Sequence, residues 1–345
     1  MAQDVPDKMR VSVLHGVGQV VTDERPVPVP GPEEVLVKVL AVGTCGSDVH
    51  YYEHGRIGDF VVERPLVLGH EPSGVVVGGT GLDVGTRVSL EPGVPCSRCE
   101  QCHAGRYNLC PKMVFFGTPP VDGAFCQYVA VRADFTYPVP DSLSDEAAGL
   151  LEPLSVGVAA SRKGRVGPGS RVLITGAGPI GLVALQTALA FGASEVVVSD
   201  VNANRLRVAT ELGATATIDV SATSLAASGF EPDVLIECSG VPSVIGDGIR
   251  RLGRAGRAIL VGMGGDEIPL PLAHVQGHEI EVTGTFRYAN TWPTALALAS
   301  SGEVDLDRLV THRFGLDQVE EALTIARRDD TVIKPVVLPQ VSTYV

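Results

Sequence analysis

The chain has 345 residues, which is too many for one ordinary hydrophobic core, so we expect about two domains. Hydrophobic residues make up 45% and charged residues 19% of the chain, as is typical of globular proteins. The net charge is −13, with 40 acidic against 27 basic residues, which argues against nucleic acid as a partner. The N-terminal residues MAQDVPDKMR have no apolar stretch typical of a signal peptide, so we expect no secretion.

The first 140 residues are predicted to be rich in β-structure. Strand-like runs cover residues 35–42, 75–77 and 88–90, and glycines and prolines separate them. Helical periodicity is scarce here, so we expect few helices before residue 140.

After Glu152, strand and helix patterns alternate along the chain. Strands are predicted at 171–175, 195–200, 233–238 and 258–262, and helices at 182–191 and 204–212. This alternation indicates an α/β doubly wound parallel sheet of the Rossmann type. The uncharged stretch 172–193 has the length of a membrane span, but its glycines and Pro179 favour a strand, a turn and a helix instead.

The segment after about Phe286 is too short to form a domain. Its patterns predict helices at 294–301 and 319–327 and a final strand at 332–338. We expect it to pack back onto the first part of the chain. The prediction is therefore a discontinuous, β-rich first domain (1–154 and 287–345) and a Rossmann domain (155–286).

The sequence GAGPIG at residues 176–181 has the spacing GxGxxG. On its own this motif is weak, but here it follows a predicted strand and opens a predicted helix, as dinucleotide binding requires. Gly176 is expected to make the tight turn, Gly178 to let the backbone approach the pyrophosphate, and Gly181 to let the helix pack on the sheet. The helix N-terminus then presents free N–H groups to the phosphates.

Asp200 ends the next predicted strand, about 20 residues further on. A carboxylate there accepts hydrogen bonds from ribose hydroxyls and repels a 2′-phosphate, which predicts NAD rather than NADP. The alternative is that Asp200 only begins a helix and binds no ligand. Arg205 weakens the prediction slightly, because an arginine nearby is able to meet a phosphate.

Four cysteines, Cys96, Cys99, Cys102 and Cys110, fall within one short segment. Four thiolates at such spacing suit a closed tetrahedral zinc site, which is a structural site because no position is open. The alternatives are disulfides, an iron–sulfur cluster, or free cysteines in a core. Polar residues between the cysteines argue against the core, and the absence of a secretory signal argues against disulfides.

The candidate metal ligands outside this four-cysteine lobe (residues 96–110) are Cys45, His70, Glu71 and Glu152. Each alone is weak, because a lone histidine is more often a core residue and Cys45 suits a small hydrophobic position. Together, a cysteine, a histidine and a carboxylate suit a catalytic zinc with one position open to water or substrate.

Several stretches resemble one known family. They include CGSDVHYYEHGRIGDFVVERPLVLGHEPSG, GRYNLC, LLEPLSVGV, GAGPIG, LIECSG and TGTFRYANTWP. The chain resembles the zinc-containing medium-chain dehydrogenases over nearly its whole length, and within them the polyol dehydrogenases of the sorbitol (L-iditol 2-) and xylitol type. The resemblance implies a GroES-like catalytic domain of β-barrel character beside a Rossmann domain.

The resemblance also implies roles for single residues. Cys45, His70 and Glu71 match the ligands of the catalytic zinc. Glu152 lies beside the metal and holds water or substrate, and which carboxylate ligates directly is left open. Ser47 and His50 match positions of a proton relay. The positions that meet the polyol are Tyr51, Glu152, Arg287 and Tyr288. The positions that meet the cofactor are Gly176, Gly178, Pro179, Ile180, Gly181, Asp200, Arg205, Val261, Gly262, Met263, Thr285, Phe286 and Arg287.

The function implied is oxidation of a polyol at C2 to the ketose, with hydride transfer to NAD and two zinc ions per chain. The alternatives are another dehydrogenase of this family, acting on arabinitol or threonine, and a zinc- and NAD-binding sensor without turnover. We expect a small-molecule substrate, no nucleic-acid or membrane partner, a cytoplasmic location, and a homodimer or homotetramer.

Overall fold

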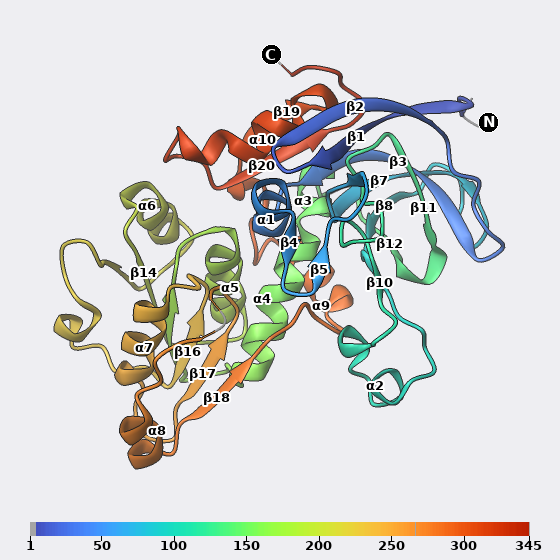
Figure 1. Cartoon of the computed structure of the whole chain (residues 1–345). Coiled ribbons are helices and arrows are strands. Elements are labelled where there is room, and N and C mark those ends of the chain that lie inside the picture. The colour runs from blue at the N-terminus through green and yellow to red at the C-terminus, as the bar shows by residue number, and fades with distance from the viewer. Residues whose placement is uncertain (1–4, 266, 345) are drawn as a thin grey trace. The chain divides into compact units, whose positions relative to one another are not determined.

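The computed structural model describes residues 5–265 and 267–344 and divides into two compact units (Figure 1). Unit 1 comprises Met1–Glu152 and Leu306–Val345, and unit 2 comprises Pro153–Asp305. The C-terminal segment from Leu306 onward groups with the first part of the chain. Strand β20 (Lys334–Leu338) pairs antiparallel with β3 (Glu34–Gly43), although nearly the whole chain separates them in sequence.

A seven-stranded sheet organises unit 1, in the order β12-β8-β7-β3-β20-β19, with β11 also on β3. The strands predicted at 35–42, 75–77 and 88–90 are confirmed within β3, β7 and β8. The remaining strands of this sheet are β7 (Glu71–Gly79), β8 (Arg87–Leu90), β11 (Tyr128–Arg132), β12 (Thr136–Pro138) and β19 (Val310–Gly315). A second sheet joins β1 (Lys8–Gly16), β2 (Gln19–Pro26) and β6 (Leu66–Val67), and two hairpins join β4 (Arg56–Ile57) to β5 (Phe60–Val61) and β9 (Gly93–Val94) to β10 (Val114–Phe115).

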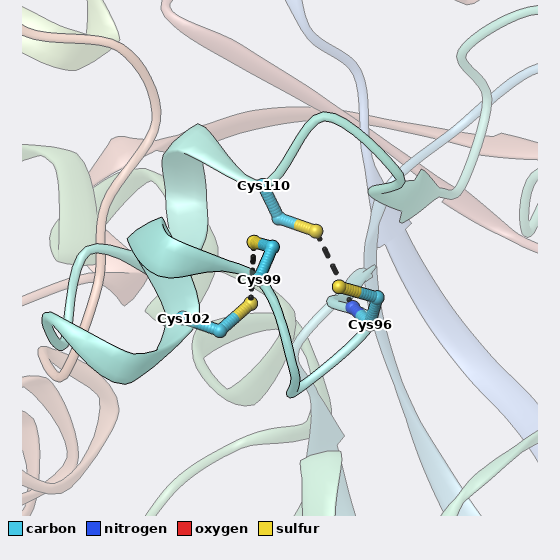
Figure 2. Close-up of side chains that lie close together, drawn as sticks. All are labelled: Cys96, Cys99, Cys102 and Cys110. Atoms are coloured by element: carbon cyan, nitrogen blue, oxygen red, sulfur yellow. Dashed lines mark hydrogen bonds between the residues drawn. The ribbon is translucent and has the colours of Figure 1, made fainter.

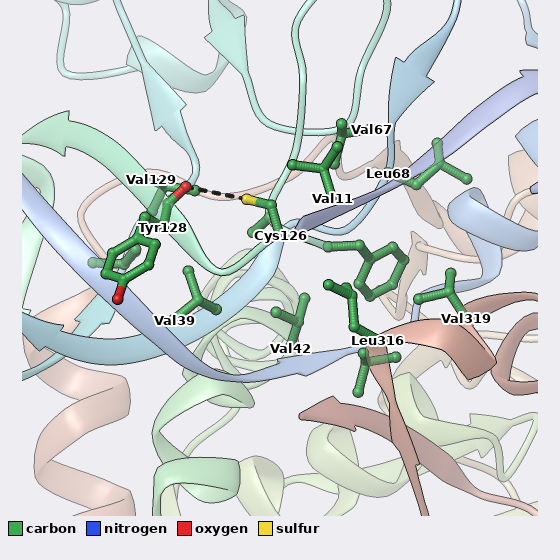
Figure 3. Close-up of a cluster of buried hydrophobic side chains, with 14 of the residues drawn as sticks. Val11, Val39, Val42, Val67, Leu68, Cys126, Tyr128, Val129, Leu316 and Val319 are labelled. Carbon is green, nitrogen blue, oxygen red and sulfur yellow. Dashed lines mark hydrogen bonds between the residues drawn. The ribbon is translucent and has the colours of Figure 1, made fainter. Parts of the chain in front are cut away.

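The core of unit 1 draws apolar side chains from distant parts of the sequence. Figure 3 shows Val11 of β1 and Val39 and Val42 of β3 in one cluster with Leu316 and Val319. Because β3 is packed on both faces, its sequence is apolar apart from Glu34 and Lys38 and does not alternate strictly. Each fully buried aliphatic side chain contributes about 1.5–3 kcal/mol, so the C-terminal segment is held by the same core as the first strands.

Helix α1 (Gly46–His54) was missed by the sequence analysis, which expected few helices in this part. Its buried residues are Asp48, Tyr51 and Tyr52, so its inward face carries a charge and two phenols instead of an aliphatic stripe. The other helical segments of unit 1 are α2 (Glu100–His103), α3 (Asp145–Gly149), α10 (Val319–Thr324) and the 3-10 turns Tyr107–Leu109, Ala133–Phe135, Asp307–Leu309, Leu316–Gln318 and Ile325–Arg327. Helix α4 (Leu151–Gly164) follows α3.

Unit 2 is built on a six-stranded parallel sheet in the order β15-β14-β13-β16-β17-β18. In chain order this is 3-2-1-4-5-6, which confirms the predicted doubly wound Rossmann sheet. The strands are β13 (Arg171–Thr175), β14 (Glu195–Asp200), β15 (Ala216–Asp219), β16 (Val234–Glu237), β17 (Arg257–Leu260) and β18 (Glu281–Gly284). The helices are α5 (Pro179–Ala190), α6 (Ala203–Glu211), α7 (Pro242–Arg251), α8 (Leu272–His278), α9 (Trp292–Ser301) and the 3-10 turn Leu225–Ser228.

Residues 287–305 group with unit 2, whereas the sequence analysis assigned them to the first domain. Polar contacts explain this placement. Arg162 donates to Asn290 O and Thr294 Oγ1, both at 2.7 Å, and Gln186 Oε1 accepts from the N–H of Asp305 at 2.7 Å. The described helices include none that is both long and apolar enough to cross a membrane.

Candidate metal centres and nucleotide turn

The four lobe cysteines lie between β9 and β10 and converge on one point (Figure 2). Their sulfur atoms all lie within 4.8 Å of one another, and Cys99 Sγ is 3.4 Å from Cys102 Sγ. Four sulfurs around a zinc ion, each at about 2.3 Å from it, lie about 3.8 Å apart, so the described cluster fits a tetrahedral ion. No position is left open by four thiolates, which is typical of a structural site.

The thiols of this lobe differ in acidity. A hydrogen bond from the backbone N–H of Arg98 lowers the pKa of Cys96 to about 6, whereas burial raises the pKa of Cys102 to about 11. Four thiolates this close repel one another, so all four ionise together only around a cation. The arrangement therefore suits a metal ion.

Glu91 connects the lobe to the sheet of unit 1. This buried carboxylate follows β8 and accepts hydrogen bonds from Tyr107 of the lobe at 2.8 Å and from Tyr137 of β12 at 3.0 Å. Burial raises the pKa of Glu91, and the two phenols partly offset that rise. The lobe is thus attached by a buried polar contact as well as by its chain ends.

A second cluster brings together Cys45, His70 and Glu71, whose ligand atoms lie within 4.8 Å of one another. Cys45 is the N-cap of α1, directly after β3, and Glu71 is the first residue of β7. Gly43 of β3 pairs with Glu71 in the antiparallel ladder, which places the end of one strand beside the start of the other. A thiolate, an imidazole and a carboxylate are a ligand set typical of a catalytic zinc, with one position open.

Asp48 fixes two of these ligands. Its buried carboxylate accepts from the backbone N–H groups of Cys45 and Gly69, both at 3.0 Å, and lies 3.4 Å from His70 Nδ1. Burial raises the pKa of Asp48, but His70 and these N–H groups lower it by a larger amount, so the pKa ends below its ordinary value. Burial lowers the pKa of His70, but Asp48 and Cys45 raise it more, and it ends well above its ordinary value. A carboxylate in this place orients the imidazole toward a metal.

Glu71 is paired with Lys334, which the sequence analysis did not name. The Lys334 ammonium lies 2.7 and 2.8 Å from the two carboxylate oxygens and donates to Thr44 O at 2.8 Å. Burial lowers the pKa of Lys334, whereas Glu71, Cys45 and Glu152 raise it, and it ends above its ordinary value. The only hint in the sequence is a single charge in the apolar strand TVIKPVVL.

The other residues predicted around this site lie on α1 and α4. Ser47 is half-buried, His50 is exposed and stacks edge-on with His54 at 4.6 Å, and Tyr51 is buried. Glu152, in the first turn of α4, is buried but lies outside the described cluster of Cys45, His70 and Glu71. Of the two candidate carboxylates, Glu71 is therefore the one grouped with the thiol and the imidazole.

The predicted glycine turn joins β13 to α5, so its strand–turn–helix context is confirmed. Gly176 has φ +90°, and a Cβ on Gly181 would lie 1.8 Å from Gly176 O. Only glycine suits either place, for the turn and for helix packing respectively. A Cβ on Gly178, the N-cap of α5, would meet nothing within 4 Å, so that position faces open space.

Asp200 lies at the end of β14 and contacts this turn directly. Its Oδ2 accepts from the N–H of Ala177 at 2.6 Å, and its Oδ1 accepts from the N–H of Asn202 at 2.8 Å. Each carboxylate oxygen has a second lone pair, so both are still able to accept from a ribose. Arg205 lies on α6 and donates its backbone N–H to Asn202 Oδ1 at 3.1 Å.

The remaining predicted cofactor positions follow β17 and β18. The N–H groups of Val261 and Gly262 donate to Glu237 O, and that of Thr285 donates to Leu260 O. Met263 and Phe286 are exposed. The Arg287 guanidinium lies 4.8 Å from the Phe286 ring centre, and the ring centres of buried Tyr288 and Trp292 lie 5.7 Å apart. The turns after β13, β14, β17 and β18 therefore leave the sheet at its carboxyl edge, where such folds bind nucleotides.

Two family descriptions match the chain. Residues 31–141 match the "Alcohol dehydrogenase GroES-like domain", and residues 179–301 match the "Zinc-binding dehydrogenase". Sorbitol dehydrogenase of Rattus norvegicus is 47% identical over 328 residues, which cover 92% of both chains. The predicted GroES-like and Rossmann architecture is thereby confirmed.

Solved structures share this fold over nearly the whole chain. One from Escherichia coli CFT073, described as a short chain alcohol dehydrogenase with NADH, has a TM-score of 0.90 and 29% identity, covering 97% of this chain and 100% of that one. A zinc-binding dehydrogenase candidate from Sinorhizobium meliloti 1021, bound to NADP, has a TM-score of 0.89 and 31% identity, with the same coverage. Since the two hold different cofactors, the fold alone does not choose between NAD and NADP.

We expect Cys99→Ser to harm stability before chemistry, because a closed four-thiolate ion ties the lobe together and leaves no position for substrate. The variant should lose one zinc per chain and lower the Tm by about 5 °C or more. Zinc content and thermal unfolding measure both effects. Cys126→Ser is the control for zinc content, since Cys126 is buried in the core of unit 1 and belongs to neither described cluster. A Cys99→Ser protein that is as stable as the parent but inactive contradicts the structural role.

Proposed function

The chain belongs to the zinc-binding alcohol dehydrogenase family, and we propose that it oxidises a sugar alcohol at C2 to the ketose, with hydride transfer to NAD. Sorbitol, xylitol and L-iditol are the substrates considered. The observation that carries the proposal is the cluster of Cys45, His70 and Glu71 in a chain that also has a nucleotide turn at Gly176–Gly181. The sorbitol dehydrogenase relative supports a polyol as the substrate class.

Two zinc ions per chain are proposed, and the described residues fit both. Cys45, His70 and Glu71 would hold the catalytic ion, and the four lobe cysteines would hold the structural one. When bound, the catalytic zinc polarises the alcohol oxygen and the nicotinamide accepts the hydride. Asp48 keeps His70 oriented through its Nδ1 contact, which favours binding through the other ring nitrogen.

The chain's own residues then have to position the alcohol and remove its proton. We assign the proton transfer to Ser47 and His50, because both lie on α1, one half-buried and one exposed, and so lead from the ligand Cys45 toward solvent. Buried Glu152 is assigned to hold water or a substrate hydroxyl. Tyr51, Arg287 and Tyr288 are assigned to other hydroxyls of the polyol.

The deciding test is NADH formation over a panel of polyols, with threonine, arabinitol and a short secondary alcohol included. We expect turnover of sorbitol, xylitol or L-iditol above the others. His70→Ala should lose one zinc per chain and reduce kcat by at least about a thousandfold, because the metal contributes several kcal/mol to stabilising the alkoxide. No NADH from any alcohol would favour a sensor, and an active His70→Ala enzyme would contradict the metal assignment.

NAD is proposed over NADP because the Asp200 carboxylate meets the ribose and repels a 2′-phosphate. A hydrogen bond to a charged group contributes about 1.5–3 kcal/mol, so Asp200→Ala should weaken NAD binding by roughly 10–100-fold and relax the exclusion of NADP. Because Asp200 also accepts from Ala177, Asp200→Asn is the matched variant that removes the charge while keeping the side chain's size. Equal kcat/KM with NAD and NADP in the unmutated enzyme contradicts the proposal.

Arg287 is proposed to bind hydroxyls distant from the reacting carbon, so it should separate from the metal by mutation. Arg287→Ala should keep both zinc ions, lose kcat/KM on sorbitol and xylitol, and affect a short secondary alcohol less. Some loss of NAD affinity is expected, because Arg287 follows Thr285 and Phe286 at the cofactor positions. Zinc content and kcat/KM on both substrate types are the measurements. An equal loss on every alcohol leaves Arg287 as a cofactor residue only.

A cytoplasmic location and a homodimeric or homotetrameric state are proposed from the family resemblance alone. Light scattering coupled to size exclusion measures the oligomeric state, and a monomer contradicts it.

A further inference from the structure

We propose that Lys334 is the positioning residue that presents Glu71 to the catalytic zinc. This inference rests on the proposed function only in requiring a metal at Cys45, His70 and Glu71. Lys334 comes from β20, the last strand, and reaches the site from a part of the chain that the ligand motifs do not include.

The ammonium of Lys334 holds both sides of the ligand set. It contacts the two Glu71 oxygens at 2.7 and 2.8 Å, and it donates to the backbone oxygen of Thr44 at 2.8 Å. Thr44 immediately precedes the ligand Cys45. An ammonium has three donors, and these three acceptors use them all. Lys334 therefore ties a metal-binding carboxylate to the backbone that carries a metal-binding thiol.

Gly43 lies against the Glu71 carboxylate. A Cβ on Gly43 would lie 2.0 Å from Glu71 Oε2, and 2.9 Å from Leu150 Cδ2. The carboxylate thus contacts both a position that tolerates only hydrogen and an ammonium that binds both of its oxygens. A Glu71 oxygen also lies within 4.8 Å of the ligand atoms of Cys45 and His70, so the carboxylate that Lys334 holds is the one at the proposed metal cluster.

Burial makes this contact costly to lose. The side chains of Lys334 and Glu71 are 2% and 0% exposed. Removing one partner of a buried ion pair leaves a charge without compensation, and such losses are far larger than those at a surface pair. Partners that orient a metal ligand from behind typically contribute about 10–100-fold to metal affinity. Lys334 is such an orienting partner of Glu71, as Asp48 is of His70.

Arg313 provides a control for the attachment of the C-terminal segment; its ion pair is more exposed than that of Lys334, with side chains 38% and 14% exposed. It lies on β19, beside β20, and pairs with Glu146 through two hydrogen bonds of 2.6 Å each. This pair also joins the C-terminal segment to the first part of unit 1, but it contacts none of the proposed zinc ligands. Arg313→Met therefore weakens the attachment of the segment without touching Glu71.

The experiment compares Lys334→Met, Gly43→Ala and Arg313→Met with the unmutated full-length protein, without substrate or cofactor. Zinc per chain is measured after dialysis against chelators of increasing strength, with thermal unfolding beside it. Cobalt is then substituted for zinc, because its visible spectrum separates a four-thiolate site from a site of mixed ligands. Lys334→Met should lose about 10–100-fold in affinity at the mixed-ligand site and keep the lobe metal. Gly43→Ala, which displaces the same carboxylate with Lys334 intact, should do the same, and Arg313→Met should keep both metals.

Lys334→Met with parental or tighter binding at the mixed-ligand site overturns the inference. If Lys334→Met does not fold, Gly43→Ala decides, and unchanged affinity or an unchanged cobalt spectrum there overturns it. A parallel loss of metal in Arg313→Met also overturns it, because attachment of the segment would then explain the effect. Failure of the proposed function is distinct, since a protein that oxidises no polyol but loses only the mixed-ligand metal on Lys334→Met keeps this inference.

Discussion

Charged groups of unit 1 lie inside it, and a charge removed from water has to find its partners within the protein. Asp48 meets two backbone N–H groups and His70, and Glu71 meets Lys334. Asp48 contacts the proposed zinc ligand His70, and Glu71 is itself a proposed zinc ligand. The need to compensate buried charge therefore sets the conformation of the site, since the strands and α1 have to bring these partners together.

The same need gives a reason for the discontinuous architecture. An apolar core is enough to hold the C-terminal segment against β3, as the cluster around Val42 and Leu316 shows. That core does not explain a buried lysine in β20, because a lysine without a partner opposes burial. With Lys334 on Glu71, the last strand both joins β19 to β3 in the sheet and contacts a proposed zinc ligand. Loss of this strand would then remove more than hydrophobic area.

The two clusters of proposed metal ligands differ in whether they leave a position open on the ion. The lobe offers four sulfurs from one short segment, which leaves no open position and suits a stabilising ion. The other cluster combines a thiol, an imidazole and a carboxylate from two segments of the chain. Buried partners contact two of these ligands, since Asp48 contacts His70 and Lys334 contacts Glu71. A site that has to accept substrate needs orientation from its surroundings, because its ligands alone do not close it. In unit 2, Asp200 has a comparable double role, because it accepts from the glycine turn and is proposed to meet a ribose.

The sequence by itself determined what depends on local pattern. The strands β13 and β14, the glycine turn and the four-cysteine lobe follow from periodicity and spacing within a few residues, and the motif around Cys45 and the pair His70–Glu71 pointed to residues that the structure groups together. It missed α1, whose buried face carries Asp48, and the short edge strands β15 and β18, whose apolar signal is weak. Only the tertiary structure decided that Glu71 groups with Cys45 and His70, that residues 287–305 belong with unit 2, and that Lys334 enters the site. These outcomes depend on pairing between distant strands, Gly43 with Glu71 and β20 with β3, and no spacing within one segment encodes such a contact.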